Sequence, residues 1–163
     1  MNRPPAAPTP ADQQRLALLI EAEAIQLGEF VALLEREEAL LTSGDTDALL
    51  ALTQDKNERY RRLQRLSDDR ALLLGRLGRV SSDTTLRELL ADLPRVLARW
   101  DEVIGLARQA GERNAINGKL ILERMAHNQA ALSVLLAAAD QAPLYDADGH
   151  TRTVGGGRIL GSA

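Results

Sequence analysis

A histidine and a glutamate one helical turn apart are the first pattern in this sequence that could do chemistry. His127 follows Glu123 by four residues, a spacing that places both side chains on one face of a helix. In helical bundles such pairs can hold two metal ions, but a matching Glu and His set must then lie on a facing helix. The other histidine, His150, lies outside every expected helix. His127 is therefore interpreted as a surface residue, and no metal site is predicted.

Two segments near the C-terminus resemble the beginnings of ligand-binding loops. Asp146-x-Asp148-Gly149 has the opening spacing of a calcium loop but lacks the remaining ligands and the terminal glutamate. Gly155-Gly156-Gly157 lacks the Lys-Ser/Thr pair of a phosphate-binding loop. Cysteine is absent, which removes thiolate nucleophiles and zinc–sulfur sites. Because no nucleophile, base and orienting group can be assembled, we expect neither catalysis nor a cofactor.

The densest basic cluster consists of Arg59, Arg61, Arg62 and Arg65. Acidic residues surround it, and Tyr60 is the only aromatic residue nearby. The chain has a net charge of −3 and a pI near 5.4, so no global field attracts nucleic acid or an anionic bilayer. The cluster is interpreted as a solvated helix face, and no nucleic-acid partner is expected.

The composition indicates what kind of elements carry these residues. Hydrophobic residues make up 45% of the chain but aromatic residues only 2%, and leucine and alanine supply most of the rest. Such residues keep their freedom in helices, whereas strands favour β-branched and aromatic side chains. No apolar stretch approaches the roughly 20 residues that would span a bilayer. We therefore expect an all-α, coiled-coil-like bundle that is cytoplasmic and not inserted in a membrane.

Local signals predict a hairpin of two long antiparallel helices over residues 10–78. The prolines among residues 1–9 predict that this segment is disordered, after which Thr9-Pro10 caps and opens the first helix. Ser43-Gly44 ends that helix, and Asp45 can cap the next one almost at once. A connection this short forces the two helices to be adjacent and antiparallel.

A third long helix is predicted from residue 93 to about 139, after a short helix that opens with the Thr85–Glu88 capping box. Glycines at 105, 111 and 118 leave open whether it is continuous or kinked. The predicted domains are the disordered residues 1–9, a bundle at 10–140 and a flexible tail at 141–163.

Heptad seams, meaning apolar positions that alternate in steps of three and four, run along all three long helices. Lys56 and Arg70 interrupt the second seam, where they either extend to its edge or set the register. The third seam consists of Leu97, Trp100, Ile104, Ala107, Gly111, Asn114, Gly118, Ile121, Met125, Asn128, Leu132, Leu135 and Ala139.

Two features exceed what an ordinary bundle needs. Residues 130–139 are apolar on nearly every face, so they must be covered by the bundle, by a second copy or by a partner helix. The tail carries an isolated Tyr145 and the pair Ile159-Leu160 in a glycine-rich context. Either the tail is idle or it holds a short binding motif.

Several segments resemble the FlgN-type flagellar export chaperones. Asn114-x-x-Asn117-Gly118-x-Leu120-Ile121, with Asn128-Gln129-x-Ala131-Leu132-x-x-Leu135, is similar to the family signature. The sequence from Leu144 to Gly149 is similar to the Tyr-x-x-Asp-Gly element that follows it. Together with the segment around Thr53 to Leu63, the resemblance spans most of residues 12–149.

The resemblance implies a chaperone that binds the C-terminal helices of the flagellar hook-associated proteins of the hook–filament junction. It implies delivery to the type III export apparatus through the cytoplasmic domain of the export gate and the export ATPase complex. It assigns cargo binding to Asn117, Gly118, Ile121, Met125, Asn128, Leu132 and Leu135. It assigns gate binding to Tyr145, Asp148 and Gly149. The alternative is a structural or adaptor coiled coil without cargo, and monomer and homodimer are both left open.

Overall fold

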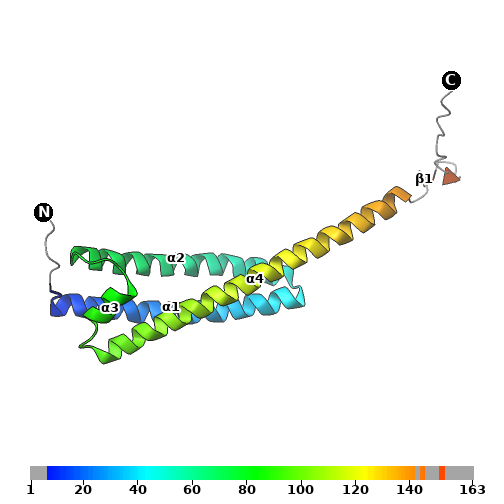
Figure 1. Ribbon diagram of the computed structural model, residues 1–163. Coiled ribbons are helices and arrows are strands. Elements are labelled where there is room, and N and C mark those ends of the chain that lie inside the picture. Colours follow the sequence, from blue (N-terminus) through cyan, green and yellow to red (C-terminus); the bar gives the residue numbers. More distant parts are fainter. Residues whose placement is uncertain (1–6, 142–143, 146–150, 153–163) are drawn as a thin grey trace, which may run out of the picture. The chain divides into compact units, whose positions relative to one another are not determined.

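The computed structural model describes residues 7–141, 144–145 and 151–152. Its first two helices, α1 (Pro10–Ser43) and α2 (Thr46–Arg76), lie side by side and antiparallel, as the sequence predicts (Figure 1). They are followed by the short helix α3 (Asp83–Leu89) and the long helix α4 (Pro94–Gln141). The expectation of an all-α fold built on a long-helix hairpin is confirmed.

The ends of the hairpin helices follow their predicted local signals. Thr9 and Asp12 form a reciprocal capping box, in which the Thr9 hydroxyl accepts a hydrogen bond from the Asp12 amide at 3.2 Å. Hydrogen bonds that the Thr9 hydroxyl and the Thr9 amide donate to the Asp12 carboxylate hold its pKa below the ordinary value. Gly44 ends α1 with a φ of 83°, a left-handed conformation that favours glycine. Asp45 then caps α2 through the Ala48 amide at 3.0 Å.

The short helix α3 begins earlier than predicted. Its N-cap is Ser82, whose hydroxyl accepts from the Thr85 amide at 3.2 Å, so the predicted start at Thr85 is wrong. Both residues carry a hydroxyl with capping spacing, and the earlier one is used because Leu86 and Leu90 then reach the core, where both are fully buried.

Two compact units divide the chain at residues 1–121 and 122–163. Helical structure continues through the glycines at 105, 111 and 118. In the second unit, β1 (Leu144–Tyr145) pairs antiparallel with β2 (Thr151–Arg152), with Tyr145 opposite Thr151. The sequence did not predict this pairing. The predictions of a disordered N-terminus and a flexible tail fall largely on residues outside the described ranges.

The core of the first unit lies at the end where α1 begins and α2 ends. All four helices contribute to it: it contains Leu16, Ile20, Ala24, Leu73, Leu74, Leu86, Leu89, Leu90, Trp100 and Val103. A smaller cluster of Phe30, Val31, Leu34 and Ala110 joins α4 to α1 further along. The first part of α4 is therefore held to the hairpin by its apolar side chains.

The face that α4 presents to α1 differs from the predicted seam. Val103, Ala110 and Asn117 are buried, each one residue before or after a seam position. The seam residues Ala107 and Gly111 are exposed. The hairpin thus leaves the seam of α4 uncovered over part of its length.

Circular dichroism should show at least roughly 65% helix, about twice the average of globular proteins. This follows from the length of α1, α2 and α4, which span 34, 31 and 48 residues. A helix content below half would contradict the architecture.

Candidate functional site

Two ion pairs fix the register of the hairpin. Glu37 of α1 accepts from the Lys56 ammonium of α2 at 2.9 Å, and Glu23 accepts from the Arg70 guanidinium at 2.8 Å. Both glutamates are buried, and both pairs of positions are two heptads apart on their own helix. A slip of the antiparallel register would separate both pairs at once and leave buried charges without partners. Lys56 and Arg70 therefore occupy the seam as register-setting residues.

Asn117 connects α4 to the same network. Its side chain is fully buried, and its Nδ2 donates to the Leu34 carbonyl at 2.9 Å and to Glu37 at 2.8 Å. One carboxylate thus binds all three long helices together. The heptad pattern alone did not identify Glu37 as a buried residue. The signal was present, since Glu23 and Glu37 have the same spacing as Lys56 and Arg70.

Replacing Glu37 with alanine should lower the free energy of unfolding by about 1.5 kcal/mol, the lower end of the range of about 1.5–3 kcal/mol for a hydrogen bond to a charged group. Part of the full cost of a buried pair is avoided because the Lys56 side chain is 21% exposed and can be rehydrated. Urea unfolding measures the change. Glu58→Ala is the matched control, because its pair with Arg62 is exposed and should contribute less than about 0.5 kcal/mol. Equal losses in both variants would contradict the register-setting role.

Trp100 contacts Arg70, which belongs to the second of these ion pairs. The Arg70 guanidinium lies 4.9 Å from the centre of the indole ring, a cation–π distance. The indole Nε1 donates to Asp83 at 2.8 Å, and this bond, with that from Arg87, holds the pKa of the Asp83 carboxyl below its ordinary value. These contacts anchor the start of α4 on α2 and α3.

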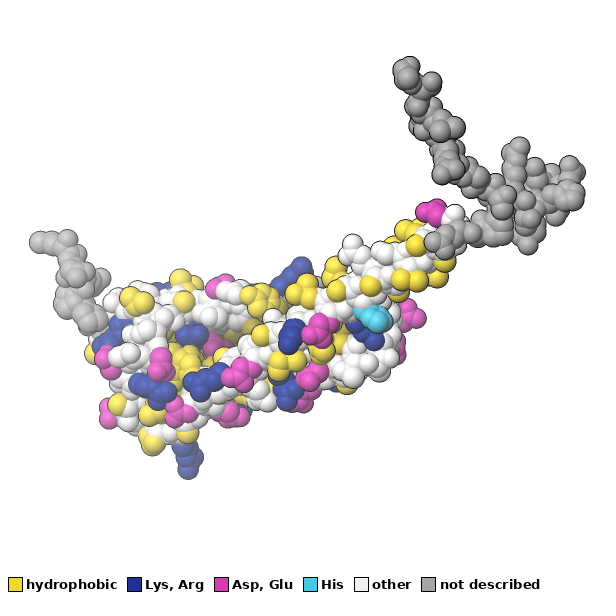
Figure 2. Space-filling model, turned by 45° about the vertical axis from the view of Figure 1, so that its right-hand side comes forward, with side chains coloured by type: hydrophobic (Ala, Val, Ile, Leu, Met, Phe, Trp, Pro, Cys, Tyr) yellow, Lys and Arg dark blue, Asp and Glu magenta, His cyan; other side chains and the backbone are white. Residues whose placement is uncertain are grey.

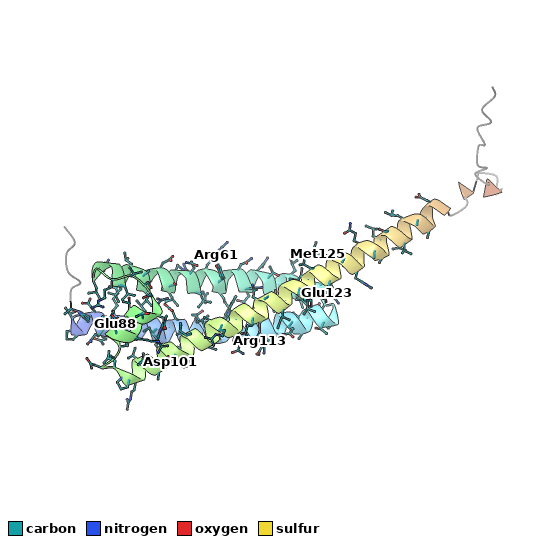
Figure 3. The ribbon with its side chains drawn as sticks, in the orientation of Figure 1. Arg61, Glu88, Asp101, Arg113, Glu123 and Met125 are labelled. Atoms are coloured by element: carbon teal, nitrogen blue, oxygen red, sulfur yellow. The ribbon has the colours of Figure 1, made fainter. Side chains whose placement is uncertain are left out.

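Exposed ion pairs hold the outer side of α4 on α1. Arg113, labelled in Figure 3, pairs with Glu35 at 3.0 Å and Glu38 at 3.1 Å. Arg99 pairs with Glu21 at 2.8 Å. Pairs as exposed as these contribute little individually, so they orient α4 more than they stabilise it.

A groove of about 590 Å³ separates α2 from α4, with α1 at its base. Its α2 side includes the seam positions Lys56, Tyr60, Leu63 and Arg70. Its α4 side includes the seam positions Trp100, Ile104, Ala107, Gly111 and Asn114. A Cβ atom added at Gly111 would meet no atom within 4 Å. The groove between these two seams is therefore not filled by side chains of the first unit.

The second unit exposes an apolar helical segment. Figure 2 shows hydrophobic side chains predominating over the last turns of α4. The exposed large side chains are Leu122, Met125, Leu132, Val134, Leu135 and Leu136, each more than half exposed. No Asp, Glu, Lys or Arg lies between Met125 and Ala139. A contiguous apolar surface of this kind marks a binding site.

The residues to which the resemblance assigns cargo binding differ in how far their side chains are exposed. Ile121, Met125, Asn128, Leu132 and Leu135 are exposed, and Gly118 is partly exposed. Asn117 instead lies inside the bundle, where it holds α4 on α1, so a direct contact with cargo stays a prediction.

The residues to which the resemblance assigns gate binding lie at or beyond the limit of what the structure describes. The backbone of Tyr145 belongs to β1. Asp148 and Gly149 lie outside the described residues. The gate-binding assignment therefore stays a prediction for all three.

The described residues bring together no three His, Cys, Asp or Glu side chains that could hold a metal ion. Among the described helices, none combines the length and the apolarity that crossing a membrane requires.

The model of the FlgN protein family matches residues 12–153, which is most of the chain. The chain belongs to the FlgN family. Two FlgN relatives, both called flagella synthesis protein FlgN, show the same similarity. The protein of Yersinia enterocolitica is 26% identical over 153 residues, covering 88% of this chain and 97% of the relative. That of Yersinia enterocolitica serotype O:8 / biotype 1B is 25% identical, covering 91% and 95%.

No solved structure matches this FlgN-family chain. The family match includes the exposed segment of α4 and extends through Tyr145 to the residues after β2. The apolar segment and the isolated tyrosine thus both lie within the part of the chain that the family shares.

Proposed function

We propose that this protein is a cytoplasmic, non-catalytic export chaperone of the bacterial flagellum. It binds the C-terminal helices of hook-associated proteins of the hook–filament junction, prevents their premature assembly and delivers them to the type III export apparatus. The observation that carries this proposal is the uncharged, exposed helical segment from Met125 to Ala139 in a chain of the FlgN family.

The physical basis for cargo binding is the burial of this segment. Each fully buried leucine or methionine contributes about 1.5–3 kcal/mol, and the seam face of the segment exposes Met125, Leu132 and Leu135. An amphipathic cargo helix can lay its own apolar stripe against Met125, Leu132 and Leu135. Such a stripe would otherwise drive the cargo to associate with itself, so the same contact explains how a chaperone prevents premature assembly.

We propose that the tail binds the export apparatus and so delivers the cargo. Tyr145 follows the end of α4, in a segment that the family shares, and an aromatic side chain is a frequent anchor in a partner's pocket. The proposed partner is the cytoplasmic domain of the export gate, with Asp148 and Gly149 completing the motif.

The proposal is tested by mixing the purified chain with a peptide that contains the C-terminal helix of a hook-associated protein. Isothermal titration calorimetry should show a saturable 1:1 complex with a negative heat-capacity change, the marker of apolar burial. A scrambled peptide of the same composition is the control. A chain that ignores both peptides would favour the alternative, a structural or adaptor coiled coil without cargo.

A further inference from the structure

Two stretches of the α4 seam include exposed positions that the described chain leaves uncovered, and the two stretches have the same length. The first, from Trp100 to Asn114, lines the groove between α2 and α4, and its exposed positions are Ala107, Gly111 and Asn114. The second is the seam from Met125 to Ala139, whose leucines are exposed. Each surface spans 15 residues, or roughly 21 Å of helix. The first surface borders an unfilled groove, whereas the second is an exposed apolar helix.

Their positions on α4 match in a two-fold antiparallel pairing of two copies. Residues whose numbers add up to 239 then face each other, so Trp100 faces Ala139 of the second copy and Asn114 faces its Met125. Every seam position between these limits meets a seam position of the second copy. In heptad terms, each a position meets a d position, as antiparallel helices require.

The side chains that face each other in this pairing are complementary in size. The small Ala107 meets the large Leu132. Near the two-fold axis Gly118 meets Ile121. Alternating large and small residues across a seam fills the space between two helices without voids.

The two surfaces are also compatible in charge. The segment from Met125 to Ala139 brings no acidic side chain, lysine or arginine into the groove. The charged residues that line the groove are Glu23, Lys56 and Arg70, and all three are already paired within the bundle. An uncharged helix can therefore be buried there without leaving a charge unpaired.

We propose that the protein forms a two-fold homodimer in which residues 125–139 of each copy occupy the groove between α2 and α4 of the other. The contact is isologous, so two identical sites are filled at once and the assembly closes at two copies. In a consequence that rests on the proposed function, the dimer covers the cargo surface, and cargo must displace the second copy.

The test exchanges the sizes of one facing pair. Ala107→Leu places a larger side chain opposite Leu132 of the second copy, and Leu132→Ala leaves a hole opposite Ala107. Each single variant should weaken the dimer at least about 10-fold in sedimentation equilibrium, because tightly packed seams tolerate neither overpacking nor voids. The chain carrying both substitutions should recover the wild-type dissociation constant within about 3-fold. Residues 107 and 132 are 25 positions apart in the continuous helix α4, so they do not touch within one copy and only contact between copies can produce this recovery.

Both substitutions exchange good helix formers at exposed positions, and circular dichroism should confirm that every variant keeps its helix content. A wild-type chain that stays monomeric at all concentrations would overturn the proposal. The proposal would also be overturned if neither single substitution changed the dissociation constant of the dimer. The same holds if the double variant lost as much dimer affinity as the two single variants together. A monomer whose cargo-peptide affinity falls with Ala107→Leu would show that cargo, and not a second copy, occupies the groove. Loss of peptide binding with the dimer unchanged would instead contradict the proposed function alone.

Discussion

Replacing Leu132 and Leu135 together with aspartate should reduce the affinity for a cargo C-terminal helix at least about 100-fold. Both side chains are exposed and lie one turn apart in the uncharged segment of α4. Cargo binding would transfer two carboxylates from water into an apolar contact, which costs several kcal/mol without a compensating partner. Calorimetric titration of the peptide into the variant measures the loss.

The control is a second pair of aspartates in the same segment, Ala130→Asp and Ala137→Asp. These positions are also exposed and carry a similar helix-propensity cost, but they lie on the face opposite the seam. The control should keep cargo affinity within about 3-fold, since exposed substitutions away from a contact usually have small effects. Unchanged affinity in the seam variant, with helix content and melting preserved, would show that cargo binds elsewhere.

The hairpin could be predicted from sequence because its boundaries depend on local chemistry. Thr9-Pro10 and Gly44-Asp45 satisfy backbone groups within one turn, whatever packs around them. The start of α3 could not be settled in this way, because Ser82 and Thr85 both have capping spacing. The choice between them depends on which leucines reach the core.

The face of α4 that packs on α1 could not be predicted from periodicity. Its seam has apolar or small residues at nearly every expected position, yet the buried residues Val103, Ala110 and Asn117 lie beside it. Asn117 explains the shift, because its amide binds the Leu34 carbonyl and Glu37 only when this face turns inward. A polar contact between residues 80 positions apart leaves no local trace in the sequence.

The candidate cargo surface was predictable for a different reason. A helix that is apolar on every face signals an additional partner by its composition alone, and the structure leaves those side chains exposed. The burial of Asn117 was not predicted. Its place in the family signature suggests contact with cargo, whereas its burial shows that it also stabilises the bundle. A shared residue can serve the fold and the site at once.

Tyr145→Ala should weaken binding to the cytoplasmic domain of the export gate at least about 30-fold, equivalent to about 2 kcal/mol for an aromatic anchor. Tyr145 follows the last residue of α4, so its loss should leave helix content, melting temperature and cargo affinity unchanged. Titration of the purified gate domain with wild-type and variant chaperone, each saturated with cargo peptide, measures the effect.

The chain offers a matched control for this substitution, because its second tyrosine, Tyr60, lies on α2 and is 59% exposed. Tyr60→Ala removes the same ring from the bundle and should leave gate affinity unchanged. Tyr145→Phe keeps the ring and removes only the hydroxyl, so it separates apolar anchoring from a hydrogen bond. If both substitutions at Tyr145 leave gate binding intact, the tail does not engage the gate through this residue. A lowered melting temperature in Tyr145→Ala would instead show that the ring packs on the folded chain.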